Sequence, residues 1–167
     1  MMELPIAIIG ARGPINDVDS ILEKADTLSK KNMVEIQLMD ADMICGRPHL
    51  LSAIEHAKRS FERRENTCTT LSKEILLYAA GERQIKNALK TIGIKKDTKR
   101  IAMIVTGKCS INALLRDMDF TMDNSVLDEK IGILQKYGVS KKEADSVIKS
   151  KIYDLILERV AMVDIIK

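Results

Sequence analysis

Apolar and polar residues alternate along this chain with two different periods, and the shorter period marks the strands. Residues 34–38 alternate strictly, which is typical of a strand with one buried face. Residues 4–9 and 101–105 are short apolar runs rich in β-branched side chains, and they predict strands buried on both faces. A further extended piece is expected at residues 43–45. The pattern therefore predicts three to four strands.

The longer period, three to four residues, marks the helices. It predicts helices at residues 17–30, 48–64, 71–91 with an interruption at Gly81, 111–115, 127–137 and 141–166. Local signals support several of these starts. Pro48 suits a first helical turn, Thr70 is a capping residue, and Ser140 with Glu143 forms a capping box before the last helix.

This order of elements predicts a mixed α+β (α/β) fold. We expect a small sheet of three to four strands covered by several helices, with a long C-terminal helix. A length of 167 residues, 46% of them hydrophobic, fits one domain (1–167) with a core of ordinary size.

Composition indicates the cellular compartment in which the protein is expected. The sequence has no run of about 18 apolar residues, so neither a membrane span nor a membrane partner is expected. The first residues predict a buried strand rather than a secretory signal. Cys45, Cys68 and Cys109 form no CxxC motif and are odd in number, which predicts neither disulfides nor a zinc site. We expect an intracellular, cytoplasmic protein.

Positive charge is concentrated in the middle of the chain. Residues 47–100 hold 13 Lys/Arg and 6 Asp/Glu, a net charge of +7, whereas the remaining residues hold 14 and 18. A locally basic region on a nearly neutral chain indicates a specific polyanion site rather than general adhesion.

One candidate for that site is a face of the helix predicted at residues 48–64, which we call the basic stripe. It consists of side chains three or four residues apart and two flanking cations: His49, Ser52, His56, Arg59, Arg63, Lys58 and Arg64. A row of cations and imidazoles suits the phosphates and base edges of single-stranded RNA. The alternatives are a solvated helix face and, for either histidine, a place in the core.

Two shorter segments offer further polar groups. Residues 78–84 read YAAGERQ, where small residues permit close approach of a backbone and Arg83 and Gln84 offer donors at a helix break. An ordinary helix kink is the alternative. Arg12 lies in GARG after the first strand, a segment that lacks the spacing of nucleotide-binding loops but places a cation near a strand end.

The usual catalytic sets are missing from the sequence. Its two histidines are seven residues apart on one predicted helix without a third ligand, and no GxSxG motif occurs. The aspartate pairs Asp40/Asp42 and Asp117/Asp119 lack the glycine of metal-binding loops. We therefore expect no enzyme activity, no metal and no cofactor.

Apolar residues exceed the needs of a one-sided surface helix at two places. The first is Leu71, Ile75, Leu76 and Leu77, and the second is the chain end at residues 162–167. Each is either core or a surface on which a partner docks.

Three separated segments resemble one known family. They read ARGPINDVD, IQLMDADMICGRPHLLSAIEHAKRSF and EILLYAAGERQIKNALKTIGI. In this order they resemble the small regulatory subunit of the KEOPS complex, which binds that complex's protein kinase/ATPase, and the archaeal form most of all. The resemblance covers nearly the whole chain and is most specific at residues 36–94.

The resemblance implies a mixed α/β fold without catalytic activity. It implies a role in the threonylcarbamoyladenosine modification of tRNA, in which a synthase subunit makes the transfer. The regulatory subunit would bind the kinase, and through it the synthase, and would hold the single-stranded CCA 3′ end. The RNA-contact candidates are then His49, His56, Lys58, Arg59, Arg63, Arg64, Tyr78, Arg83, Gln84 and, more weakly, Arg12.

Leu71, Ile75, Ile165 and Ile166 become candidates for docking the kinase. One segment departs from the family pattern, because Thr67-Cys68-Thr69 stands where an aliphatic residue is expected. Two hypotheses follow: a tRNA-binding subunit, or a protein adaptor that regulates the kinase and binds RNA only incidentally.

Overall fold

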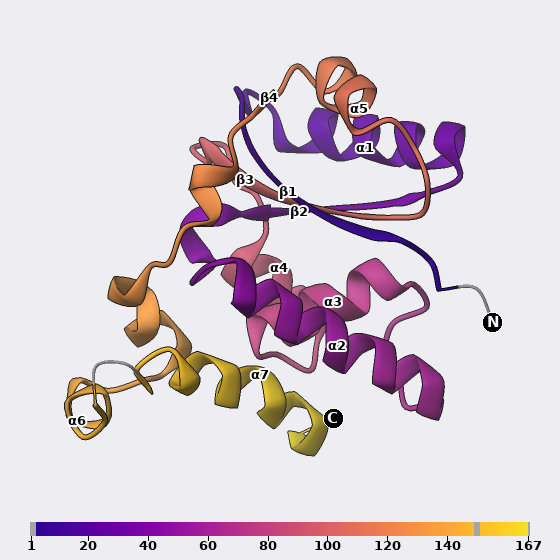
Figure 1. The fold of residues 1–167 in the computed structure, drawn as a ribbon. Helices are drawn as coiled ribbons and strands as arrows, with labels where there is room; N and C mark the ends of the chain where they lie inside the picture. Colours follow the sequence, from indigo (N-terminus) through magenta and orange to yellow (C-terminus); the bar gives the residue numbers. More distant parts are fainter. Residues whose placement is uncertain (1–2, 149–150, 167) are drawn as a thin grey trace.

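The structure is a computed structural model that describes residues 3–148 and 151–166, and these residues form one antiparallel sheet flanked by helices (Figure 1). Its strands are β1 (Ile6–Arg12), β2 (Glu35–Asp40), β3 (Arg100–Thr106) and the short β4 (Thr121–Met122). Their order across the sheet is β2-β3-β1-β4. The predicted mixed α+β fold with a small sheet is confirmed.

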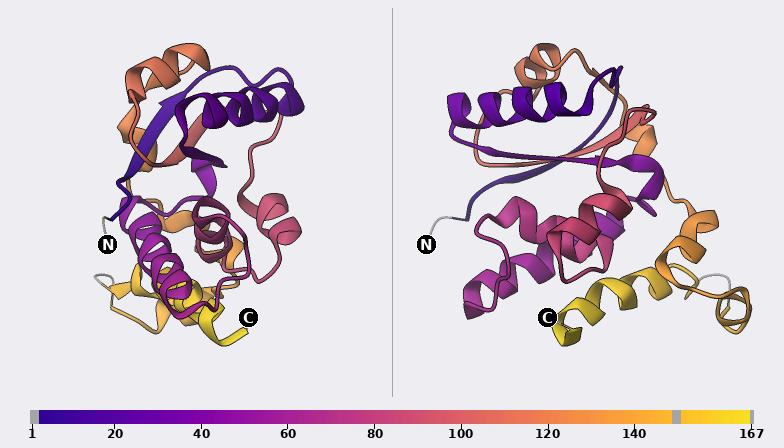
Figure 2. Two further views of the ribbon diagram at one scale, coloured as in Figure 1. Left: turned by 90° about the vertical axis from the view of Figure 1, so that its right-hand side faces the viewer. Right: turned by 180° about the vertical axis from the view of Figure 1, so that it is seen from behind.

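Alternation along β3 divides the interior into two cores. Ile101, Met103 and Val105 pack toward α1 (Val18–Asn32) and α5 (Ile111–Asp117) on one face of the sheet; Ala102 and Ile104 pack on the other face. That second face is covered by α2 (Arg47–Arg63) and α3 (Leu71–Ala80), and α7 (Asp154–Ile166) lies beyond them (Figures 1 and 2). The helices α2 and α3 are therefore packed between the sheet and α7.

Helix α4 (Ile85–Ile92) follows α3 after a glycine break, as the sequence predicts. Gly81 caps α3 at φ 67°, a left-handed conformation that glycine adopts without strain. Four residues later the chain is helical again, with only Ala88 and Ile92 of α4 fully buried. Most of α4 is thus surface. None of the described helices is long and apolar enough to cross a membrane.

The long helix predicted at residues 141–166 is divided. Helix α6 spans Lys141–Asp145, and α7 begins only at Asp154. Tyr153, the residue before α7, lies at the start of α2, where its hydroxyl accepts a hydrogen bond from the His49 N–H at 3.0 Å. This contact between residues 104 positions apart is invisible in local periodicity.

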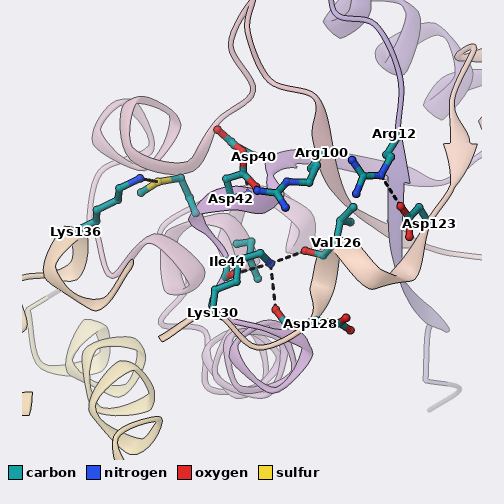
Figure 3. A network of polar contacts seen from close by, with 11 residues as sticks. Arg12, Asp40, Asp42, Ile44, Arg100, Asp123, Val126, Asp128, Lys130 and Lys136 are labelled. Atoms are coloured by element: carbon teal, nitrogen blue, oxygen red, sulfur yellow. Dashed lines mark hydrogen bonds and ion pairs between the residues drawn. The ribbon is translucent and has the colours of Figure 1, made fainter. Parts of the chain in front are cut away.

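The helix predicted at residues 127–137 is also wrong in type. Two 3₁₀ segments replace it, η2 (Asn124–Leu127) and η3 (Ile131–Tyr137). Between them the Lys130 ammonium donates to the carbonyls of Ile44, Val126 and Asp128, which ties this stretch to the segment before α2 (Figure 3). Burial lowers the pKa of Lys130.

Two further local predictions need correction. Residues 41–43 form the 3₁₀ turn η1 (Ala41–Met43), so only the end of the predicted extended piece at 43–45 is non-helical. The segment GARG does not follow the first strand, because β1 continues from Ile6 through Gly10 to Arg12. A Cβ on Gly10 would lie 2.5 Å from the Asp123 carbonyl oxygen, so glycine is needed there for close approach of the chain after β4.

Candidate nucleic-acid interface

His49 belongs to the core and not to the exposed face of α2. Its side chain is fully buried, its Nε2–H donates to the Ala79 carbonyl at 2.8 Å, and its Nδ1 accepts from the Cys45 N–H at 3.1 Å. Burial lowers the pKa of His49 to about 4, so the ring is neutral and carries its proton on Nε2. The prediction that His49 lies on the outer face is wrong, because α3 covers the first turns of α2.

His56 and Tyr78 link α2 and α3 to α7. The His56 Nδ1–H donates to Asp164 Oδ2 at 2.7 Å, and the Tyr78 hydroxyl donates to Asp164 Oδ1 at 2.5 Å. The two rings are stacked with centroids 5.5 Å apart. Tyr78 is fully buried, so its ring offers no surface on which an RNA base could stack.

Of the basic stripe, only the arginines at the C-terminal end of α2 are left as exposed cations without an ion-pair partner among the described residues. Lys58 forms an ion pair with Glu3 at 2.6 Å, and this hydrogen bond raises the pKa of Lys58 and lowers that of Glu3. Arg59, Arg63 and Arg64 are exposed. Among the described residues their side chains form no ion pair.

Arg12 lies at the end of the sheet and not with the other candidates. Its Nε is 2.5 Å from Asp123 Oδ2, and hydrogen bonds from Ser125 and Arg12 lower the pKa of Asp123 to about 2. Arg100, its partner across β1 and β3, pairs with Asp42 at 2.5 Å (Figure 3). Both guanidinium groups already hold a carboxylate.

The structure gathers another set of cations at a surface hollow of about 610 Å³, which we call the α3–α4 pocket. Its lining comes from the loop before α3, from α3 itself and from the start of α4: Thr67, Cys68, Thr69, Lys73, Arg83, Gln84, Ile85, Lys86 and Leu89. Lys73, Arg83 and Lys86 are exposed, and within the described part of the chain their side chains form no hydrogen bond or ion pair.

The glycine break explains why Arg83 and Gln84 reach this pocket. Gly81 ends α3, and the Glu82 N–H then bonds back to the Leu77 carbonyl at 3.1 Å. Gln84 is extended at the start of α4, so the turn carries both side chains to the surface. The half-buried Ile85 and the 45% exposed Leu89 add apolar surface beside the cations.

This arrangement can bind a ligand that is both anionic and flat. Cations attract phosphate, an apolar side chain covers part of a base, and the Gln84 amide can donate and accept at a base edge. Sequence reasoning found Arg83 and Gln84 but missed Lys73 and Lys86. Lys86 lies three residues after Arg83, and residues 83–100 carry seven Lys/Arg against one Asp, so charge density could have indicated this segment.

Of the candidates for docking the kinase, some are buried and others are exposed. Ile75 is fully buried and cannot touch a partner in this structure, while Leu71 is half-buried beside Leu4 and Phe61 in a separate groove. Ile165 is 75% exposed, and with Met162 and Ile166 it forms what we call the α7 surface. A pocket of about 680 Å³ lies against it.

Sequence comparisons show which proteins this chain is similar to. Residues 15–164 match the family described as kinase binding protein CGI-121. The chain belongs to the CGI-121 family. It is also 28% identical over 95 residues to the regulatory protein Cgi121 of Methanocaldococcus jannaschii, an alignment that spans 57% of this chain and 61% of that relative. The family expected from the resemblance of three segments is confirmed.

Among the described residues, no cluster of three or more His, Cys, Asp or Glu could hold a metal ion.

Proposed function

We propose that this CGI-121 protein is a non-catalytic regulatory subunit of KEOPS. It holds the single-stranded CCA 3′ end of tRNA during threonylcarbamoyladenosine modification and docks the complex's kinase. The observation that carries the RNA half of the proposal is the α3–α4 pocket, where Lys73, Arg83 and Lys86 surround apolar side chains without carboxylate partners.

The work of such a site is positioning rather than chemistry. Phosphates of the 3′ end lie against the three cations, and a terminal base packs on Ile85 and Leu89. The Gln84 amide bonds the edge of that base. A 3′ end fixed in this way orients the rest of the tRNA toward the synthase subunit that the kinase carries.

Kinase docking is assigned to the α7 surface. Met162, Ile165 and Ile166 expose apolar area at the end of a helix whose opposite side is buried on α2 and α3. Apolar groups exposed together are typical of a surface that a partner covers. The description of the family as kinase-binding supports this assignment.

The RNA proposal is tested by titrating the protein with whole tRNA and with tRNA that lacks its CCA end, at two salt concentrations. We expect strong binding only with the CCA end, and each phosphate contact to a single strand contributes roughly 0.7 to the log–log salt slope. Equal binding to both RNAs would contradict the proposal.

Equal binding would leave the second candidate, an adaptor that regulates the kinase with RNA binding incidental. The α7 surface favours this reading because it does not depend on RNA. Ile165→Glu is expected to abolish co-purification with the kinase, whereas Leu22→Glu, a change at a 43% exposed leucine on α1, leaves it intact. Retained co-purification of the Ile165 variant would refute the assignment of the α7 surface.

A further inference from the structure

Glu74 is a fully buried carboxylate directly behind the α3–α4 pocket. It lies in the first turns of α3, yet its side chain turns back toward the loop that precedes the helix. Oε2 accepts from the N–H groups of Thr67 at 3.0 Å and Cys68 at 2.8 Å. Oε1 accepts from the Ser60 hydroxyl at 3.1 Å and from the Thr67 N–H at 3.2 Å.

These bonds fix the loop from within. Two successive N–H groups of the loop point inward to one carboxylate, and the Asn66 side-chain amide bonds the Cys68 carbonyl at 2.9 Å. Thr67, Cys68 and Thr69 therefore have one defined backbone path. The same three residues line the α3–α4 pocket, so Glu74 determines the shape of that wall without reaching the pocket surface itself.

The hydrogen bonds of Glu74 account for a buried carboxylate at this position. A negative charge behind an anion site opposes ligand binding, and a buried carboxylate is costly unless several donors neutralise it. The donors to Glu74 include the loop's own N–H groups and the Ser60 hydroxyl. A polar loop held in one conformation before the ligand arrives loses less entropy on binding, which raises affinity.

We propose that Glu74 is a positioning residue for RNA binding, which acts by holding residues 67–69 as the preformed wall of the α3–α4 pocket. The proposal rests on the function proposed above. It assigns no RNA contact to Glu74.

The test compares Glu74→Gln with Arg83→Ala and with the control Glu62→Gln, a matched change at an exposed glutamate of α2. In Glu74→Gln the amide oxygen still accepts a hydrogen bond, but the amide NH₂ group faces N–H groups of the loop and cannot accept from them. Losing one charge-assisted bond to the loop should weaken RNA binding about tenfold. Because no phosphate contact is lost, the salt slope stays unchanged. Arg83→Ala should instead lower that slope by roughly 0.7.

Co-purification with the kinase is the control for folding, and it should be unchanged in all three variants. Unchanged RNA affinity of Glu74→Gln, with Arg83→Ala weakened, overturns the role of Glu74 and leaves the proposed function standing. A lowered salt slope in Glu74→Gln also overturns it, since that would mean lost phosphate contacts. If Arg83→Ala binds like wild type as well, the pocket itself is refuted.

A second measurement needs no variant. In the wild-type protein without RNA, the amide protons of Thr67 and Cys68 should exchange slowly with solvent, although Thr67 is exposed. Adding RNA should change their protection little, because the wall is already formed. Rapid exchange of these two amides in the free protein overturns the proposal.

Discussion

The basic stripe of α2 and the α3–α4 pocket both carry several cations, but the fold treats them differently. In α2, His49 is buried, His56 is paired with Asp164 and Lys58 with Glu3. Around the pocket, Lys73 and Arg83 have no such partner among the described residues. Helical spacing identifies residues on one face, but packing and partners decide which of them are available to a ligand.

The cause of the difference is the place of each helix in the layers. Helix α2 lies between the sheet, α3 and α7, so long side chains on two of its faces meet other elements (Figures 1 and 2). Helix α4 is short, with two buried residues, and most of its side chains face solvent. The two histidines and Lys58 on α2 thus have partners within the fold, while the exposed Lys86 on α4 is available to a ligand.

The strongest way to break this comparison is His49→Ala. The substitution leaves a cavity and an unpaired Cys45 N–H in the core, and should lower the free energy of unfolding by about 4 kcal/mol. Ser52→Ala, on the half-buried side of the same helix, is the control and should cost under about 0.5 kcal/mol. Denaturant unfolding measures both. A small change in the free energy of unfolding would contradict the burial of His49 and make it a candidate for RNA contact again.

The pH dependence of stability follows from the same histidine. Its pKa is about 4 in the folded protein against 6.5 for an ordinary histidine, so the unfolded chain takes up the proton first as pH falls. This stability is complete above pH 6.5 and is lost as pH falls to about 4, by about 3 kcal/mol in total.

His49→Ala has no such group, so the stability difference between wild type and this variant should narrow by that amount between pH 7 and pH 4. Unfolding curves at the two pH values measure it. A constant difference would mean that His49 is already charged in the folded protein, contrary to its contacts.

A smaller effect is expected in the pocket. The double change Arg83→Ala and Lys86→Ala should weaken tRNA binding about 100-fold, because each cation contributes one charge-assisted contact to phosphate. Unfolding free energy should hardly change, since both side chains are exposed. Titration and denaturant unfolding of the same preparation separate the two quantities. Loss of stability in place of affinity would reverse the roles that we assign to α2 and α4.

The smallest effect is expected from Arg59→Ala with Arg63→Ala, the exposed arginines of α2. They lie outside the lining of the pocket, so they contribute only a general positive field, and binding should weaken about threefold or less at physiological salt. The same titration measures it. A loss equal to that of the Arg83 and Lys86 pair would show that the arginine end of α2 is part of the RNA site.

Local signals in the sequence predict much of the fold but little of its long-range contacts. The alternation at residues 34–38 and the run at 101–105 identify β2 and β3, and Gly81 marks the break before Arg83. The end of α6 at Asp145 and the start of α7 at Asp154 could not be predicted, because the apolar spacing runs on between them and the contact of Tyr153 with His49 is long-range. The burial of His49 depends likewise on α3, which packs against α2.

For the α3–α4 pocket too, the sequence indicates the residues near a local turn but not those that tertiary packing brings to it. Arg83 and Gln84 were found because glycine and small residues mark a turn, which is a local property. Lys73 and the loop at residues 67–69 join the pocket only through tertiary packing, in which Glu74 holds the loop against the helix. No periodicity relates these residues to Arg83.

The most direct test of the pocket is a double-mutant cycle in which one change is made in the protein and the other in the RNA. Wild type and the Arg83→Ala, Lys86→Ala variant are each titrated with whole tRNA and with tRNA lacking its CCA end. If these side chains contact that end, the variant loses affinity for whole tRNA but binds the shortened tRNA as wild type does. Additive losses, with the variant weakened equally on both RNAs, would contradict the account and place the CCA end elsewhere on the protein.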